Sequence, residues 1–169
     1  MSTVHTPPEQ QPVSRPLIFL GGPIQGAPDW QKQAIAFISA EAPDIDIASP
    51  RRPTVTEGEF AEDEYMKQVN WEHEHLAMAA MRGVTLFWLA AEAEHVPGRS
   101  YAQTTRFELG EAVTAHRYGG TSVVVGIEKG FTNARYLRFT IGKKAPSIPL
   151  CDTLEDTCRQ AIALAHRQV

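Results

Sequence analysis

Glu108 is the residue whose position in the sequence most strongly suggests chemistry. It lies in segment 100–112, which follows the apolar run 84–89 and opens a predicted helix. Thr105 and Glu108 have the spacing of a capping box, in which the Thr hydroxyl accepts from the backbone N–H of residue 108 and the Glu carboxylate accepts from that of residue 105. A carboxylate beyond the carboxyl end of a strand also lies where open α/β sheets bind substrates. The spacing therefore leaves a structural cap and a functional carboxylate open.

A second candidate site is segment 71–75, Trp-Glu-His-Glu-His, inside a predicted helix. Residues two apart point to different sides of a helix, so His73 and His75 cannot share a metal ion there. The H-E-x-x-H spacing is absent, and zinc sites need three or four converging ligands. We therefore expect no metal, whereas Glu72 or Glu74 could face a ligand in a crevice.

Two loops could also contact a small ligand. Gly22 and Pro23 follow the apolar run 17–20 in the sequence Gly-Gly-Pro, and paired glycines allow either a tight turn or a close approach of ligand to backbone. The pattern matches neither the dinucleotide fingerprint nor the P-loop. Arg51 and Arg52 could meet an anionic ligand, although adjacent cations are more often solvated.

These residues are positioned by alternating strands and helices. Apolar runs typical of buried strands occur at residues 17–20, 45–48, 84–89, 122–127 and 148–150. Helical patterns follow Asp29, end at Arg82 before Gly83, begin at Thr105 and follow Thr153. Segment 130–144 could be strand or helix. This order predicts an α/β fold with a five-stranded parallel sheet, right-handed crossovers and helices on both faces.

Composition narrows the class of protein. A chain of 169 residues suits one domain with a substantial core, and a net charge of -4 argues against a nucleic-acid polymer as partner. No apolar run approaches the roughly 20 residues of a membrane helix. Two cysteines, expected to be buried and unpaired, favour a reduced cytoplasmic protein. Residues 1–15 are expected to be a flexible tail and residues 16–169 a single domain.

With these elements placed, the chain resembles the nucleoside 2-deoxyribosyltransferase family. Three features carry the resemblance: strand 17–20 followed by Gly-Gly-Pro-Ile, a carboxylate-bearing helix leading into strand 84–89, and Thr-Arg-Phe-Glu-Leu-Gly at 105–110. The last is similar to the family motif that contains the nucleophilic Glu. The resemblance implies a flavodoxin-like (Rossmann-like) three-layer sandwich and a homo-oligomer with shared active sites. We expect no cofactor and no membrane partner.

The resemblance implies catalytic roles for two carboxylates. Glu108 corresponds to the nucleophile, which attacks C1′ of 2-deoxyribose before a second base attacks the glycosyl-enzyme with retention of configuration. We expect the helix N-terminus to keep Glu108 charged at neutral pH. Family members also use an acidic residue near the third strand, for which we prefer Glu72 to Glu74. The family's aspartate just before the nucleophile is missing, and Tyr101 or Gln103 could replace it by hydrogen bonding.

The expected substrate-binding residues surround the same crevice. They are Gly22, Pro23, Gln25, Trp30, Arg51, Gln103, Thr105 and Asn133. Gln25 could hydrogen-bond to the base and Trp30 could stack on it, although Trp30 suits the core equally well. Asn133 lies in the region from which family members supply an Asn to the neighbouring subunit's site.

Three functions remain open from the sequence, and the expected substrates are nucleosides and nucleobases. The first is exchange of nucleobases on 2-deoxyribose through Glu108. The second is an N-glycosidase that uses the same carboxylate for hydrolysis, which Arg51 and Arg52 would favour by binding a 5′-phosphate. The third is a non-catalytic nucleotide-binding domain.

Overall fold

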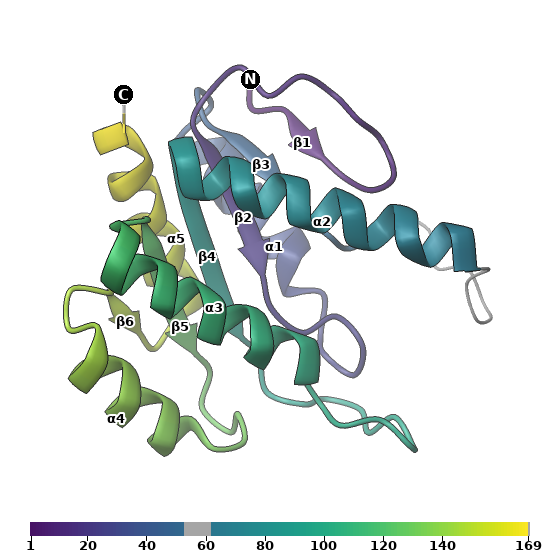
Figure 1. Ribbon diagram of the computed structural model, residues 1–169, viewed down its shortest axis with the longest axis vertical. Coiled ribbons are helices and arrows are strands. Elements are labelled where there is room, and N and C mark those ends of the chain that lie inside the picture. The colour runs from purple at the N-terminus through teal and green to yellow at the C-terminus, as the bar shows by residue number, and fades with distance from the viewer. Residues whose placement is uncertain (53–61, 169) are drawn as a thin grey trace.

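A sheet of six parallel strands lies at the centre of the computed structural model, which describes residues 1–52 and 62–168 (Figure 1). The strands are β1 (Val4–His5), β2 (Leu17–Gly21), β3 (Asp46–Ala48), β4 (Gly83–Leu89), β5 (Val123–Ile127) and β6 (Leu150–Cys151). Their order is β1-β3-β2-β4-β5-β6. Without β1, this is the flavodoxin-like order, which reverses direction between β2 and β4. The predicted fold class is confirmed, with one more strand than expected.

The additional strand corrects the prediction for the N-terminus. Val4 and His5 pair in parallel with Ile47 and Ala48 of β3. The segment that follows β1 lies along α2 (Glu62–Arg82), where the Trp71 indole N–H donates to the Glu9 carbonyl at 2.9 Å. Part of the segment that was expected to be a flexible tail therefore belongs to the sheet. The open edge of β3 offers unpaired backbone groups, and this short segment satisfies them.

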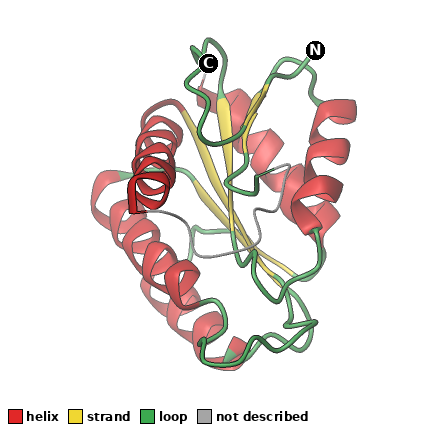
Figure 2. Cartoon of the chain, turned by 90° about the vertical axis from the view of Figure 1, so that its right-hand side faces the viewer, coloured by secondary structure: helices red, strands yellow, loops and turns green. Residues whose placement is uncertain are grey.

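Helices cover both faces of the sheet (Figures 1 and 2). One face carries α1 (Trp30–Glu41) and α5 (Leu154–Ala165), followed by the short 3-10 helix His166–Gln168. The other carries α2, α3 (Gln103–Gly119) and α4 (Ala134–Lys144). This is the expected result of right-handed crossovers in a sheet whose strand order reverses once.

β4 is the central strand, and all seven of its residues are buried. Leu86 and Trp88 join the core beneath α1 and α5, whereas Phe87 and Leu89 join the core beneath α3 and α4. A strand covered on both faces disfavours charged side chains, which explains why residues 83–89 carry none. Its carboxyl end delivers the chain to the long loop before α3.

The predicted capping box at Thr105 and Glu108 does not form. α3 begins at Gln103, and its N-cap residue Ala102 has a left-handed backbone (φ 56, ψ 29) with no side-chain cap. Thr105 is thus the third helical residue, buried with 4% of its surface exposed. Glu108 lies in the second turn of the helix, so its carboxylate is not used as a cap.

Three other local predictions are resolved. Within segment 130–144, residues Ala134–Lys144 form the helix α4, which follows Asn133 in the left-handed region (φ 60). The strand expected at residues 148–150 is β6, which begins at Leu150 and lies at the sheet edge beside β5. Gly83 does not terminate α2 in a left-handed conformation. It is the first residue of β4, where a Cβ would lie 1.9 Å from the Leu17 carbonyl oxygen.

The side-chain caps of α1 and α5 are confirmed. Asp29 accepts a hydrogen bond from the Lys32 N–H, and Thr153 accepts one from the Asp156 N–H, each at 3.1 Å. Cys151 and Cys158 are both buried and unpaired, as expected. Among the described residues, none of the helices combines the length and apolarity needed to span a membrane.

Candidate active site

The candidate site lies where the strand order reverses, at the carboxyl ends of β2 and β4. The loops that follow these two strands are held together by the Gly26 carbonyl, which accepts from the N–H groups of Ala93 (2.8 Å) and Glu94 (3.1 Å). Gly26 has φ 74, and a Cβ there would lie 2.6 Å from the Glu94 carbonyl oxygen. Only glycine fits this contact without displacement, so the two loops form one rigid rim.

Trp30 is part of the core and does not stack on a ligand. Its side chain is 1% exposed, and its indole N–H donates to the Pro23 carbonyl at 2.9 Å. A Cβ on Gly22 would lie 2.6 Å from the Trp30 ring and 2.4 Å from the Trp88 carbonyl oxygen. The close approach permitted by Gly22 is therefore to Trp30 and β4. Trp30 shapes the loop that carries Gly22 and Pro23, and the expected base-stacking role is wrong.

Arg51 anchors the same loop from outside. Its Nη2 donates to the carbonyls of Ile24 (3.2 Å) and Pro28 (3.3 Å), its Nε donates to Gln31 Oε1 at 2.9 Å, and it forms an ion pair with Asp29 at 3.3 Å. These acceptors occupy the guanidinium that was expected to bind a ligand. Gln25, at the exposed tip of the loop, accepts a hydrogen bond from Arg99.

Glu108 is half-buried on α3 and accepts no hydrogen bond from the residues that the structure describes. Burial, together with the negative charges of Glu72 and Glu111, raises its pKa to about 7. The expectation that Glu108 stays fully charged at neutral pH is therefore wrong. The second turn of a helix gains little from the macrodipole, while desolvation disfavours the carboxylate.

Glu72 is the carboxylate that the structure brings to Glu108, from the facing helix α2. Burial raises the pKa of Glu72 as well, although a hydrogen bond from Gln68 and the charges of His73 and Arg52 act in the opposite direction. Glu74, the alternative considered from the sequence, is exposed and accepts from Gln10 of the N-terminal segment at 2.7 Å. Burial thus raises the pKa of both carboxyl groups, and the charge of Glu72 acts on Glu108.

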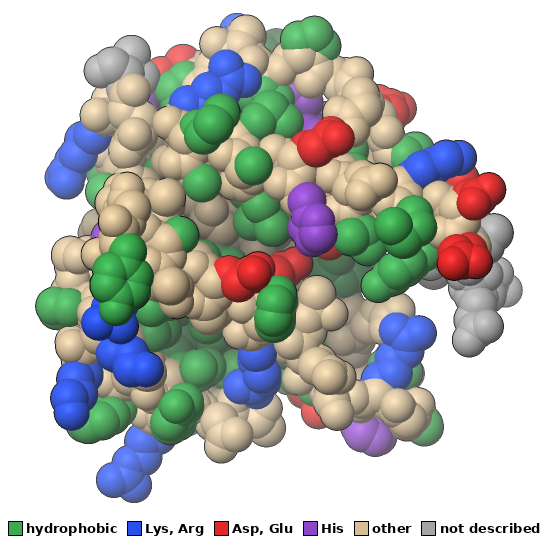
Figure 3. Space-filling model, viewed as in Figure 1, with side chains coloured by type: hydrophobic (Ala, Val, Ile, Leu, Met, Phe, Trp, Pro, Cys, Tyr) green, Lys and Arg blue, Asp and Glu red, His purple; other side chains and the backbone are tan. Residues whose placement is uncertain are grey.

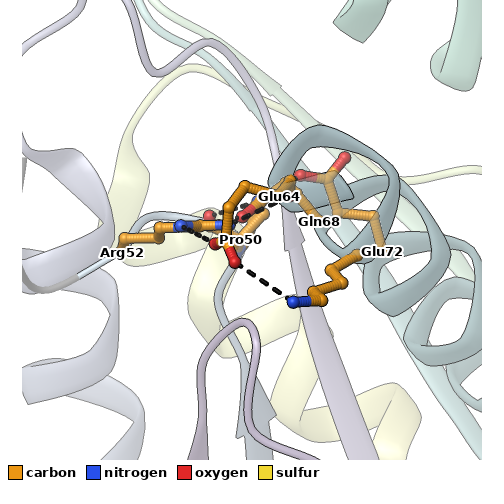
Figure 4. A network of polar contacts seen from close by, with 6 residues as sticks. Pro50, Arg52, Glu64, Gln68 and Glu72 are labelled. Carbon is orange, nitrogen blue, oxygen red and sulfur yellow. Dashed lines mark hydrogen bonds and ion pairs between the residues drawn. The ribbon is translucent and has the colours of Figure 1, made fainter. Parts of the chain in front are cut away.

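Gln68 contacts the candidate site and was not selected by the sequence analysis. Its Nε2 donates to Glu72 Oε1 at 2.6 Å and to the Pro50 carbonyl at 3.0 Å, while its Oε1 accepts from Arg52 Nε at 2.8 Å (Figure 4). Arg52 also forms an ion pair with Glu64 at 3.4 Å. Gln68 precedes Glu72 by four residues, so helical periodicity alone places the two side chains together.

Tyr101 and Gln103 lie at the N-terminus of α3. The Tyr101 hydroxyl donates to the Ala90 carbonyl at 2.7 Å. Burial, with the charges of Glu92 and Glu128, raises the pKa of Tyr101 to about 12. The hydroxyl thus stays protonated and is occupied in closing the loop. Gln103 is exposed at the first position of the helix.

Asn133 is exposed on the surface at the start of α4. It borders an open groove of about 460 Å³ that is also lined by Arg135, Tyr136 and Phe139. Glu128, a further residue that the sequence analysis missed, accepts from the Ala91 N–H at 2.7 Å and fixes the loop after β4. In the described part of the chain, no group of three or more His, Cys, Asp or Glu residues could hold a metal ion.

Comparison with known proteins supports the resemblance. No curated protein matches the chain. Residues 15–131 match the family described as nucleoside 2-deoxyribosyltransferase like. The matched segment covers more than half of the chain and includes the glycine loop, Glu72 and Glu108. The chain therefore belongs to the nucleoside 2-deoxyribosyltransferase-like family.

Proposed function

We propose that the protein exchanges nucleobases on 2-deoxyribose by double displacement, with Glu108 as nucleophile and Glu72 as proton carrier. The observation that carries this proposal is the pair of facing carboxyl groups with raised pKa values at the point where the strand order reverses. Family membership and the flavodoxin-like fold support the same class of chemistry. A glycosyl group transferred with retention needs two such groups, one to bond to the sugar and one to handle protons.

The first step makes a glycosyl-enzyme. A Glu108 carboxylate oxygen forms a bond to C1′ as the bond from C1′ to the base nitrogen breaks, and its electron pair leaves with the base. The Glu72 carboxylic acid gives its proton to that base. The positive charge that develops at C1′ stabilises the ionised form of Glu108, and Glu72 carries the proton in this step.

The second step reverses the first with a different base. A nitrogen of the incoming base attacks C1′, the ester bond to Glu108 breaks, and the electron pair returns to its carboxylate. The proton lost by the incoming base goes to Glu72. Two inversions at C1′ give net retention, and the pair of carboxyl groups ends in the protonation state in which it began.

Base exchange with product identification tests the proposal. The protein is incubated with deoxyadenosine and free cytosine, and deoxycytidine is the expected product. Acid quenching should also leave one deoxyribosyl group on the peptide that contains Glu108, detected by mass spectrometry. Adenine and free 2-deoxyribose without deoxycytidine would replace the transferase with a hydrolase. Absence of both products would leave a non-catalytic binding domain.

The occupied state of Arg51 bears on the choice of substrate. A 5′-phosphate would need a cation close to the sugar, and Arg51 already binds backbone carbonyls, Gln31 and Asp29. Two carboxylates in the same site would also repel a phosphate. We therefore expect deoxynucleosides to be turned over faster than their 5′-monophosphates, which competition between the two forms in one reaction measures.

The homo-oligomer stays a prediction. Four aromatic side chains on α3 and α4, Phe107, Tyr118, Tyr136 and Phe139, are each at least 66% exposed. The view in Figure 3, the same as that of Figure 1, shows hydrophobic side chains spread among charged groups on this side of the molecule. A second copy that covered them would remove apolar surface from water. Light scattering of the purified protein gives the mass, and Phe107→Asp should lower it if α3 is in the interface.

A further inference from the structure

The hydrogen bonds of Gln68 fix the orientation of its amide. Both N–H groups are used, by Glu72 Oε1 and the Pro50 carbonyl, and the oxygen accepts from Arg52 Nε (Figure 4). Rotating the amide by half a turn would place its oxygen against two acceptors and its NH2 group against a donor. Gln68 therefore presents an N–H, and never an acceptor, to Glu72.

We infer that Gln68 is a positioning residue. Its amide group holds Glu72 Oε1 as an acceptor and separates the Arg52 guanidinium from the Glu72 carboxyl group. The inference rests on the proposed function, because it concerns how Glu72 carries a proton. An oxygen that accepts from Gln68 at 2.6 Å is the less favourable one to protonate, so the proton resides on Oε2. The carboxyl group can then gain and lose a proton without rotating.

The neutrality of the amide is essential to this role. A direct ion pair between an arginine and a carboxylate lowers the pKa of the carboxyl group by about 1–3 units, which would leave Glu72 unable to carry a proton at neutral pH. Gln68 instead accepts from Arg52 on one side and donates to Glu72 on the other. Arg52 thus fixes the position of Glu72 through a neutral group. Its charge is further balanced by Glu64.

Among the residues that the structure describes, the charged groups that act on Glu72, or on which Glu72 acts, come from three elements. They are His73 on α2 itself, Arg52 in the segment after β3, and Glu108 on α3. A new charge at position 68 would be closer to Glu72 than Arg52 is, since Gln68 lies between them. It should therefore move the titration of the carboxylate pair in a direction set by its sign.

Two substitutions of opposite charge test the inference. Gln68→Glu places a negative charge against Glu72 and should move the pH profile of base exchange upward by about one unit, whereas Gln68→Lys should move it downward by a similar amount. Both should lower kcat at the wild-type optimum by about tenfold with a smaller change in KM, because the proton carrier is affected and not the sugar contacts. Carboxyl carbon NMR titration of Glu72 should show the same two signs.

Gln10 provides the matched control, since its amide donates to Glu74 on the other side of α2 at 2.7 Å. Gln10→Glu and Gln10→Lys should leave both the pH profile and the Glu72 titration unchanged. Shifts of the same sign, or none, in the Gln68 variants would overturn the inference. The NMR titration needs no turnover, so opposite shifts in a protein that makes no deoxycytidine would refute the proposed function alone. Either variant by itself gives a sign if the other fails to fold.

Discussion

The two sides of helix α2 carry polar groups in different environments. Toward the sheet and β1, Trp71 and His75 stack with their ring centroids 3.9 Å apart, and the ring of His5 lies 5.8 Å from that of His75. All three side chains are buried, and in the described structure His75 Nε2 and both ring nitrogens of His5 lack a hydrogen-bond partner. Toward α3, Gln68 and Glu72 are half-buried and hydrogen-bonded.

This difference separates a structural cluster from a chemical one. Burial lowers the pKa of His75 and raises the pKa of Glu72, so both groups favour the neutral form. A shifted pKa therefore does not identify the site. Glu72 differs because a second carboxyl group, Glu108, faces it from another helix and both keep some exposure. The enclosed imidazoles of the other side have no room for a substrate.

Of the substitutions on the two sides of α2, Glu108→Gln should have the largest effect on base exchange. A small effect would contradict the distinction between the carboxylate pair and the buried histidines. We expect base exchange to fall by about a hundredfold or more, because covalent catalysis is lost. The same substitution should increase the stability of the folded protein at high pH. The folded-state pKa of about 7 exceeds the ordinary value of 4.5, so the folded protein loses stability as pH rises from 4.5 through 7. Removing this carboxylate should increase the free energy of unfolding at pH 8 by about 2 kcal/mol.

Urea denaturation at pH 4 and pH 8 checks the stability half of this prediction. At pH 4 the two proteins should be equally stable, since Glu108 is then protonated in both the folded and the unfolded chain. Glu111→Gln is the control, because Glu111 is exposed on the same helix. It should keep base exchange within about threefold of wild type, since a substitution outside the reacting pair removes no transition-state contact.

Glu72→Gln should have a smaller effect on rate and a distinctive effect on pH dependence. Loss of a positioned acid lowers the rate by about 10²-fold. The wild-type profile is expected to be bell-shaped, because the pair works with one proton, and its upper limb should lie near the Glu108 pKa of about 7. Without the charge of Glu72, the pKa of Glu108 falls, and the remaining rate should only rise with pH. A bell-shaped pH profile in Glu72→Gln would mean that a group other than Glu72 carries the proton to the leaving base.

The fold was largely predictable because its strands are buried on both faces. The apolar runs at β2, β4 and β5 follow directly from that burial. Asp29 and Thr153 are typical N-cap residues, so they mark the starts of α1 and α5 in the sequence. β1 was not predictable, since a two-residue strand has no periodicity and depends on the open edge of β3. The start of α3 was missed because alanine at φ 56 is rare and no local signal marks it.

The sequence allowed candidate carboxylates to be selected, but it did not allow their electrostatics to be predicted. Motif and spacing select Glu108 and Glu72, but the pKa of Glu108 depends on how deeply α2 and α3 bury it and on which side chains they bring together. Arg51 shows the same limit. Its position after a strand suggests an anion site, and only the folded loop reveals the carbonyl groups that occupy it. Gln68 was within reach of helical periodicity, since it precedes Glu72 by one turn.

His75→Leu should give the smallest effect and sharpens the comparison from the structural side. The pKa of His75 is lowered on folding, so the unfolded chain binds its proton first as pH falls below about 6.5. Wild-type stability should therefore decrease between pH 7 and pH 5, and His75→Leu should show a shallower decrease. At pH 8 the substitution should change stability by about 1 kcal/mol or less, because an apolar group replaces an imidazole with an unpartnered nitrogen.

Thermal unfolding across this pH range measures the slopes, with His73→Leu as the control because His73 is exposed on the same helix. Base exchange at pH 8 should be unchanged in His75→Leu, since the imidazole lies on the side of α2 away from Glu108. A loss of activity comparable to that of Glu72→Gln would mean that the enclosed cluster and the carboxylate pair act as one unit. Equal slopes in wild type and His75→Leu would instead show that His75 takes up its proton as readily in the folded protein as in the unfolded chain.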